Sequence, residues 1–205
     1  MNYKTIPTKD IVEKTMNSLK KNGHLPEFFE TKEEVLERIK ELIPKGVSVM
    51  NGASRTLEDI GFIEYLKGNS HGWNNLHAEI LAEKDVAKQN LLRKQSVLSD
   101  FYLGSAHAVT ENGEILIASN SGSQLPYTVF TSENLIFVVG VQKITPTLLE
   151  AFNRLEKHVI PLENTRMQEV AGVDTYPSKI VILNREPEFM GRKSHILFVN
   201  EELGF

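Results

Sequence analysis

The pattern of apolar and polar positions along the chain predicts helices that alternate with short strands. A first amphipathic helix opens at Thr8 and ends at Gly23. A second begins at Thr31, where Glu34 three residues later completes a capping-box pattern, and apolar residues then recur at helical spacing up to Ile43. Two helices are therefore expected before the strand at 47–50.

Short apolar runs mark the strands, and the most informative run is Leu135–Val139, which contains no polar residue. Such a run is typical of a strand covered on both faces, so it is expected near the centre of the sheet. A helix follows it, with Thr145 expected as N-cap and Pro146 as the first helical residue. This order predicts an α/β fold with one mainly parallel sheet, flanking helices and an antiparallel hairpin.

The remaining predicted elements are strands at 47–50, 179–183 and 195–199 and helices at 57–67 and 76–95, the last with Ile80, Ala87 and Leu91 on one face.

The hairpin is predicted around Asn112-Gly113, the strongest two-residue turn signal that a sequence carries. If these two residues form the turn, Glu111 faces Glu114 and His107 faces Ala118. The opposed carboxylates are then either solvated at the hairpin tip or held by a cation or a shared proton.

Composition limits the classes of protein to which the chain can belong. Its 205 residues suffice for one domain with a full apolar core, and we expect a single domain over 1–205 with 1–30 as an N-terminal helical extension. Cysteine is absent, which excludes disulfides, thiolate metal sites and iron–sulfur ligation by this chain. The net charge of −4, without a large basic cluster, argues against nucleic-acid binding. The sequence shows no signal-peptide core and no apolar run of membrane-spanning length, so a cytoplasmic protein without membrane contact is expected.

Common nucleotide and metal motifs are missing. No two glycines are spaced as Gly-x-Gly, and no glycine leads a P-loop. The closest histidines, His71 and His77, lack the spacing of metal ligands. The sequence therefore predicts neither a cofactor nor a metal.

The first candidate site is the loop Gly52–Thr56, between a predicted strand and a helix. Small residues there expose backbone N–H groups which, with the helix dipole, favour an anion, and Ser54 and Thr56 add hydroxyl donors. The alternative is that one of these two hydroxyls only caps the helix. A nucleophile elbow fits less well, because Thr56 stands where that motif has its second glycine.

The second candidate site joins His107 to the polar run Ser119–Gln124, which the hairpin brings alongside it. Histidine is the side chain best suited to proton transfer near neutral pH, and Glu111 is a second candidate for that role. The alternatives are a structural histidine and an irregular loop. The residues expected to bind a ligand are Gly52, Ala53, Ser54, Thr56, Ser119, Asn120, Ser121, Gly122, Ser123 and Gln124.

Lys143 is the third candidate, because it follows the central strand, and ligands gather at the carboxyl ends of strands in open α/β sheets. The alternative is a solvated loop lysine. Arg166 is suited to holding a carboxylate or phosphate, but an ion pair with Glu163 explains it equally well.

Five segments of the chain resemble the LUD (lactate utilisation) family, which includes the third protein of bacterial lactate-oxidation operons. The resemblance implies the fold shared by ribose-5-phosphate isomerase, glucosamine-6-phosphate deaminase and CoA transferases, in which a loop at a position like that of Gly52–Thr56 binds the phosphate or acyl-carrier part of the ligand. It also implies iron–sulfur proteins as partners. The segments are 50–61, 103–114, 117–126, 138–146 and 199–205, in the order the family has them.

We therefore expect a protein that binds a small anionic metabolite, either a hydroxy or oxo acid or a phosphorylated compound. His107 or Glu111 would move a proton, and Lys143 would offset developing charge. Whether the protein catalyses a reaction is left open, as is its oligomeric state, a homo-oligomer included. The alternative is a non-catalytic accessory subunit that docks to an iron–sulfur oxidoreductase. A serine hydrolase built on Ser54 is disfavoured, because no Asp–His pairing accompanies it.

Overall fold

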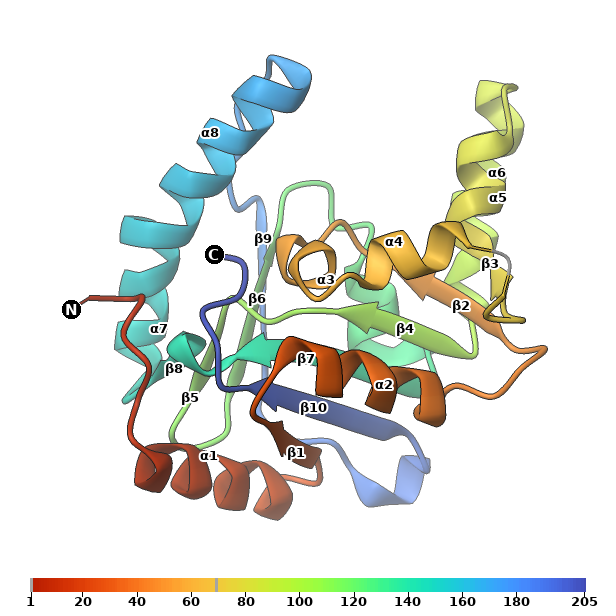
Figure 1. Ribbon diagram of the computed structural model, residues 1–205. Coiled ribbons are helices and arrows are strands. Elements are labelled where there is room, and N and C mark those ends of the chain that lie inside the picture. The colour runs from red at the N-terminus through yellow and green to blue at the C-terminus, as the bar shows by residue number, and fades with distance from the viewer. Residues whose placement is uncertain (1, 69) are drawn as a thin grey trace.

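A six-stranded sheet, parallel throughout, forms the centre of the molecule (Figure 1). The computed structural model describes residues 2–68 and 70–205. The apolar run Leu135–Val139 lies in a strand with three strands on one side and two on the other, which confirms its predicted central place. In spatial order the strands are β1 (Leu25–Phe29), β10 (Lys193–Val199), β7 (Asn134–Gly140), β4 (Phe101–Gly104), β2 (Ser48–Asn51) and β3 (Asn74–Asn75).

A second, four-stranded sheet lies against the first, where the sequence predicted a single sheet. The hairpin strands are antiparallel to each other; β8 joins one of them in parallel and β9 joins the other antiparallel. The predicted fold class is confirmed, since the fold is α/β with a parallel sheet, flanking helices and an antiparallel hairpin. The hairpin, however, belongs to a sheet of its own. The spatial order is β8 (Ile144–Thr145), β5 (Ala108–Thr110), β6 (Ile115–Ser119) and β9 (Lys179–Leu183).

Helices cover the outer faces of the two sheets, and α7 runs through a π-helical turn at Leu155–Val159 into α8 as one long rod (Figure 1). Short 3₁₀ turns follow α6 at Ser96–Leu98 and β7 at Val141–Lys143. The helices are α1 (Lys9–Lys21), α2 (Lys32–Leu42), α3 (Arg55–Asp59), α4 (Phe62–Lys67), α5 (Leu76–Ala82), α6 (Val86–Gln95), α7 (Leu148–Arg154) and α8 (Ile160–Ala171).

Strand β7 shows why its sequence is apolar on both faces. Ile136 and Val138 point to the core under α2, α3 and α4, whereas Leu135, Phe137 and Val139 point to the core shared with α1 and the second sheet. A third core lies between the second sheet and the α7–α8 rod. The four layers are therefore helices, parallel sheet, mixed sheet and helices.

The capping residues predicted for the second helix form the expected side-chain hydrogen bonds to the backbone. The Thr31 hydroxyl accepts from the Glu34 N–H, and the Glu34 carboxylate accepts from the Thr31 N–H, which confirms the predicted capping box. The helix predicted over 57–67 is instead two short helices, because Gly61 adopts a left-handed φ of 77° between them.

The helix predicted over 76–95 has the predicted ends but is interrupted. It stops at Ala82 and restarts after Asp85, whose side chain accepts from the Lys88 N–H at 2.9 Å. The stripe predicted there is also wrong, because Ile80 is buried but Ala87 and Leu91 are exposed.

The helix after the central strand begins later than predicted. Its N-cap is Thr147, which accepts from the Glu150 N–H at 3.2 Å. Thr145 belongs to β8 instead, and Pro146 precedes the cap.

The hairpin register is one residue away from the prediction. Gly113 has a φ of 86° and its N–H bonds to the Thr110 carbonyl, so the loop has three residues and not two. Glu114 consequently lies opposite Thr110, whose hydroxyl donates to its carboxylate, and not opposite Glu111. The predicted pair of opposed glutamates does not form.

The first thirty residues are not wholly helical, because β1 pairs with β10 at the edge of the parallel sheet. Val12 and Leu19 of α1 are buried in the core beneath that sheet. Within residues 2–68 and 70–205, no helix combines the length and apolar composition that crossing a bilayer requires.

Candidate functional site

A cavity of about 260 Å³ opens where β2, β4 and β7 end, and α8 contributes to its rim. We call it the strand-end cavity. Parallel strands place their carboxyl ends at one edge of a sheet, so loops far apart in the sequence meet there. The predicted residues that line it are Gly52, Ala53, Ser54, Thr56, His107, Ser119, Asn120, Ser121, Ser123, Gln124 and Lys143.

Two predicted site residues lie outside the cavity. Glu111, in the hairpin loop, forms an ion pair of 2.8 Å with Lys14 of α1. Gly122 turns the polar loop with a φ of 84°. Its missing side chain makes room for Lys179, whose Cδ would lie 2.6 Å from an added Cβ. Glu111 therefore lies outside the strand-end cavity and is not placed to carry a proton there. Gly122 has a conformational role in the polar loop.

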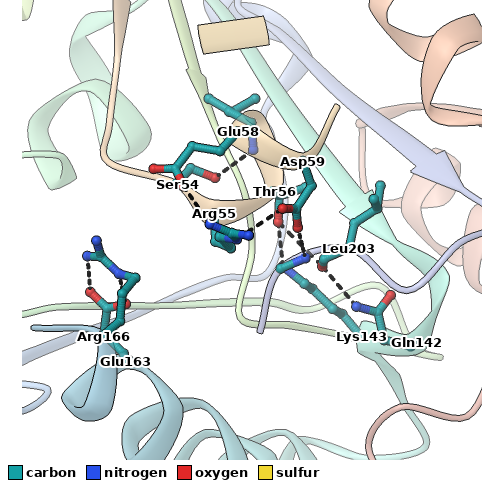
Figure 2. Close-up of polar contacts among 12 residues, drawn as sticks. Ser54, Arg55, Thr56, Glu58, Asp59, Gln142, Lys143, Glu163, Arg166 and Leu203 are labelled. Carbon is teal, nitrogen blue, oxygen red and sulfur yellow. Dashed lines mark hydrogen bonds and ion pairs between the residues drawn. The ribbon is translucent and has the colours of Figure 1, made fainter. Parts of the chain in front are cut away.

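Lys143 is buried, with 3% of its surface exposed, and its amine is held by two hydroxyls. The Nζ donates to Thr56 Oγ1 at 2.8 Å (Figure 2). It also donates to Ser105 Oγ at 3.2 Å. Among the described residues no carboxylate forms an ion pair with it, because nearby Asp59 is taken by Arg55 Nε at 3.0 Å and by the Gly204 N–H at 2.8 Å. The solvated loop lysine that the sequence allowed is thus ruled out.

The pKa of Lys143 is lowered to about 7, first by burial and then by the positive charge of Arg154, with Asp59 acting weakly in the opposite direction. Arg154 itself is fully buried and has no acidic partner within residues 2–68 and 70–205. Its Nη1 donates to the His107 carbonyl, while its Nε and Nη2 have no partner among the described residues. Burial lowers the pKa of Arg154 to about 10, so it stays charged at neutral pH. Lys143 in the cavity wall and Arg154 close to it therefore bring positive charge to this region without an acidic partner among the described residues.

His107 is neutral, and its tautomer follows from one hydrogen bond. Its Nδ1 accepts from the Ala118 N–H at 3.1 Å, so the proton lies on Nε2. Burial, together with Lys143 and Arg154, lowers its pKa to about 3. The ring is thus suited to donating a hydrogen bond at neutral pH and unsuited to taking up a proton, which corrects the predicted acid–base role.

The loop Gly52–Thr56 combines capping with close packing. Ser54 caps α3 by accepting from the Leu57 N–H at 3.3 Å, as the alternative reading predicted, while also lining the cavity. The Gly52 N–H donates a hydrogen bond to the Leu103 carbonyl. A Cβ at Gly52 would lie 2.4 Å from the Tyr102 hydroxyl, so only glycine fits there. The Gly52 N–H, which was expected to bind an anion, is therefore already engaged in a backbone hydrogen bond.

The polar run Ser119–Gln124 is held mostly by its own hydrogen bonds. Ser119 Oγ accepts from the Gly122 N–H at 3.0 Å, and Gln124 Nε2 donates to the Ala118 carbonyl at 3.1 Å. Asn120 instead reaches across to Thr175 and Ser178, which fixes the segment before β9 over the cavity. The loop is an ordered wall, with Ser121 and Ser123 at its exposed end.

Glu163 and Arg166 of α8 form a two-pronged ion pair at the rim, with both N···O distances 2.7 Å (Figure 2). The sequence left this pair open against an anion-binding Arg166, and the structure favours the pair. The acidic residue at the rim is consequently neutralised by its own partner.

Sequence reasoning did not single out Ser105 or Arg154 as site residues. Ser105 follows directly after β4, so the strand-end argument used for Lys143 would have found it. Arg154 gives no such signal, because a lone arginine in an amphipathic helix is usually exposed. Among the described residues, no group of three side chains is arranged to hold a metal ion.

These features define an α/β protein with two packed sheets and a cationic cavity at the strand ends. The chain belongs to the LUD domain family, which matches residues 12–199 and confirms the resemblance seen in the sequence. A solved structure, a DUF162 family protein from Deinococcus radiodurans, is similar over 96% of this chain and 100% of its own, with a TM-score of 0.56 and 12% identity. At that identity the likeness concerns the fold alone. No curated protein matches the sequence significantly.

Proposed function

We propose that the protein binds a small anionic metabolite in the strand-end cavity, as part of lactate or other organic-acid utilisation. The observation that carries the proposal is the charge imbalance at Lys143. Its ammonium form has only hydroxyl partners, and the buried Arg154 adds a second positive charge close by. The acidic residues Asp59 and Glu163 are each paired with an arginine. A bound carboxylate or phosphate supplies the missing negative charge.

The family supports the metabolic setting, since LUD stands for lactate utilisation. A hydroxy or oxo acid fits the small volume of the cavity, and a phosphorylated compound matches the same charge. The neutral His107 offers an Nε2–H donor to a hydroxyl or carbonyl oxygen of such a ligand. A non-catalytic accessory subunit that docks to an iron–sulfur oxidoreductase is the alternative, and the strongly shifted pKa values around the cavity favour the ligand-binding proposal over it.

A thermal-shift screen of hydroxy and oxo acids, sugar phosphates and CoA esters tests the proposal. A ligand that binds the native state raises the melting temperature by mass action. We expect the melting temperature to rise with at least one class of ligand. The rise should be lost in Lys143→Met and kept in the matched control Lys157→Met. Lys157 is exposed and lies in the π-helical turn that follows α7. No rise with any class, or an equal rise in Lys143→Met, would contradict the proposal.

A further inference from the structure

The hydrogen bonds around Lys143 suit a neutral amine, which they leave without an unsatisfied donor. The Thr56 hydroxyl donates to the Leu203 carbonyl at 3.5 Å, and the Ser105 hydroxyl donates to the Ala106 carbonyl at 3.3 Å. Each hydroxyl thus has a backbone carbonyl available to accept its own proton, which leaves both hydroxyl oxygens free to accept from Lys143 Nζ. A neutral amine has two N–H donors, which these two acceptors satisfy.

The third position on Nζ is left without a protein partner among the described residues. In the ammonium form this position is a buried N–H without an acceptor, whereas in the neutral amine it is a lone pair. Close packing holds the amine in place, because a Cβ at Gly204 would lie 2.4 Å from Thr56 Oγ1 and 3.2 Å from Nζ. The lowered pKa of Lys143 agrees with this count of donors and acceptors. A desolvated, neutral lysine amine is a nucleophile for carbonyl carbon.

The surroundings also suit the carbonyl partner. His107 lines the same cavity as a neutral Nε2–H donor, which stabilises negative charge developing on a carbonyl oxygen. The charged Arg154 lies one residue from cavity-lining Leu155 and holds the His107 backbone, so its field favours an acid group on the same small molecule.

We propose that Lys143 forms a reversible imine with a small 2-oxo acid bound in the strand-end cavity. This inference rests on the proposed function and narrows its ligand to a compound with both a carboxylate and a ketone or aldehyde. The Nζ lone pair forms a bond to the carbonyl carbon, and one of the two amine hydrogens passes as a proton to the carbonyl oxygen, which gives a neutral carbinolamine. The C–O bond then breaks, the hydroxyl group leaves as water with the second amine hydrogen, and a C=N bond remains. No oxidant or reductant takes part.

Hydride trapping tests the proposal on the full chain. The protein is incubated with pyruvate or glyoxylate at pH 7, treated with borohydride to reduce any imine to a stable secondary amine, and mapped by peptide mass spectrometry. All other lysines serve as internal controls. About half of Lys143 is neutral at pH 7, against roughly one in 3,000 molecules of an ordinary lysine with a pKa of 10.5. A less basic amine is also less reactive, which offsets part of this advantage. We expect at least about tenfold more adduct on Lys143 than on any exposed lysine.

Lys143→Arg should remove this adduct while keeping the positive charge, and Lys157→Arg should leave it unchanged. Binding of pyruvate is measured separately on the untreated wild type by ligand-observed NMR. Binding without a preferential adduct on Lys143 would overturn the imine and leave the proposed function standing. Adduct spread evenly over exposed lysines would overturn it as well. If no oxo acid binds but a hydroxy acid or phosphate ester does in the thermal-shift screen, the imine fails alone; if nothing binds, both proposals fail.

Discussion

The Nδ1 atom of His107 lies 3.1 Å from the backbone nitrogen of Ala118 and accepts its hydrogen. This contact joins the loop after β4 to β6 of the second sheet, and so couples the two sheets at the edge of the cavity. It also fixes the side chain's chemistry, because the remaining proton must lie on Nε2, on the other side of the ring.

His107 should therefore act as a hydrogen-bond donor whose charge does not change between pH 5 and 8, since its pKa is about 3. Nitrogen NMR should show the Nε2–H tautomer throughout this range. His107→Gln, which keeps an amide donor near the Nε2 position, should retain more ligand affinity than His107→Leu, which has none. A ring that titrates near pH 6.5, or equal affinity in the two variants, would contradict the donor role.

A second buried histidine should set the acid stability of the fold. His24 is 2% exposed, its Nδ1 lies 2.8 Å from Ser194 Oγ, and burial with the nearby Arg192 lowers its pKa to about 4. The unfolded chain binds a proton near pH 6.5 and the native state does not until about pH 4. The stability due to neutral His24 is therefore complete above pH 6.5 and is lost as the pH falls toward 4.

The loss amounts to at most about 3 kcal/mol, at 1.36 kcal/mol for each pKa unit. Urea unfolding of wild type and His24→Gln at pH 7.5, 6 and 4.5 measures it. We expect the variant to be less stable at pH 7.5, with a smaller further loss on acidification. Parallel losses in the two proteins would show that His24 does not cause the acid sensitivity.

The elements that the sequence predicted correctly are those determined by neighbouring residues. The Thr31–Glu34 capping box acts within one turn of helix, and the apolar run of β7 already reports burial on both faces. Strand β1 was not predicted, and it contains Pro26, a residue that a strand tolerates at the edge of a sheet. The second sheet depends on pairing β9 with β6, some sixty residues earlier in the chain, which no local pattern reports.

The same division holds for the site. The strand-end rule predicted Lys143 at the edge of the sheet where Ser54 and His107 also lie, because parallel strands determine where their following loops meet. The prediction for Glu111 rested on the hairpin instead and failed, because the register depends on whether the loop at Asn112-Gly113 has two or three residues. The protonation states of His107 and Lys143 could not be predicted from the sequence either. Their pKa values depend on burial and on the charge of Arg154, which lies in a different element of the fold.

Gly52 and Tyr102 should show strong energetic coupling. A Cβ on Gly52 would lie 2.4 Å from the Tyr102 hydroxyl, which is buried and has no hydrogen-bond partner among the described residues. Gly52→Ala alone should destabilise the protein by about 1–3 kcal/mol through overpacking. Tyr102→Phe removes an unsatisfied hydroxyl and should be close to neutral or stabilising.

In the double variant the added methyl group occupies the space of the lost oxygen, so most of the cost of Gly52→Ala should be recovered. Denaturant unfolding of the four proteins completes the cycle. Additive changes in the free energy of unfolding would show that the strain at Gly52 arises elsewhere. The expectation also implies that a bulky residue at Gly52 damages the fold, and so cannot be used as a selective test of ligand binding.

Glu111→Gln should leave ligand binding unchanged, because the side chain lies outside the cavity and pairs with Lys14 at 2.8 Å. The partner lysine is largely exposed, so solvent screens the pair and the free energy of unfolding should fall by only a few tenths of a kcal/mol. Thermal unfolding and ligand titration of Glu111→Gln and Lys14→Gln measure both quantities. A loss of ligand affinity in Glu111→Gln alone would return this residue to the site.

Lys143 should make the protein more stable as the pH rises above neutral. Its native pKa is about 7, against about 10.5 for an ordinary lysine, so between these values the unfolded chain carries a proton that the native state lacks. Stability rises with pH wherever the unfolded state binds more protons. The burial of the charged amine thus costs most below pH 7, and this cost disappears progressively toward pH 10.

Lys143→Met removes the titrating group while keeping an unbranched side chain of similar length. The free energy of unfolding of wild type minus that of the variant should therefore increase between pH 7 and pH 10, with an upper limit of about 5 kcal/mol. Lys157→Met, at an exposed position, should show no such trend. An anionic ligand should shift the wild-type curve, because it stabilises the ammonium form of Lys143 and raises its pKa toward the ordinary value. A difference between wild type and Lys143→Met that is flat with pH would mean that the amine is charged in the native state, and would remove the physical basis for treating it as a nucleophile.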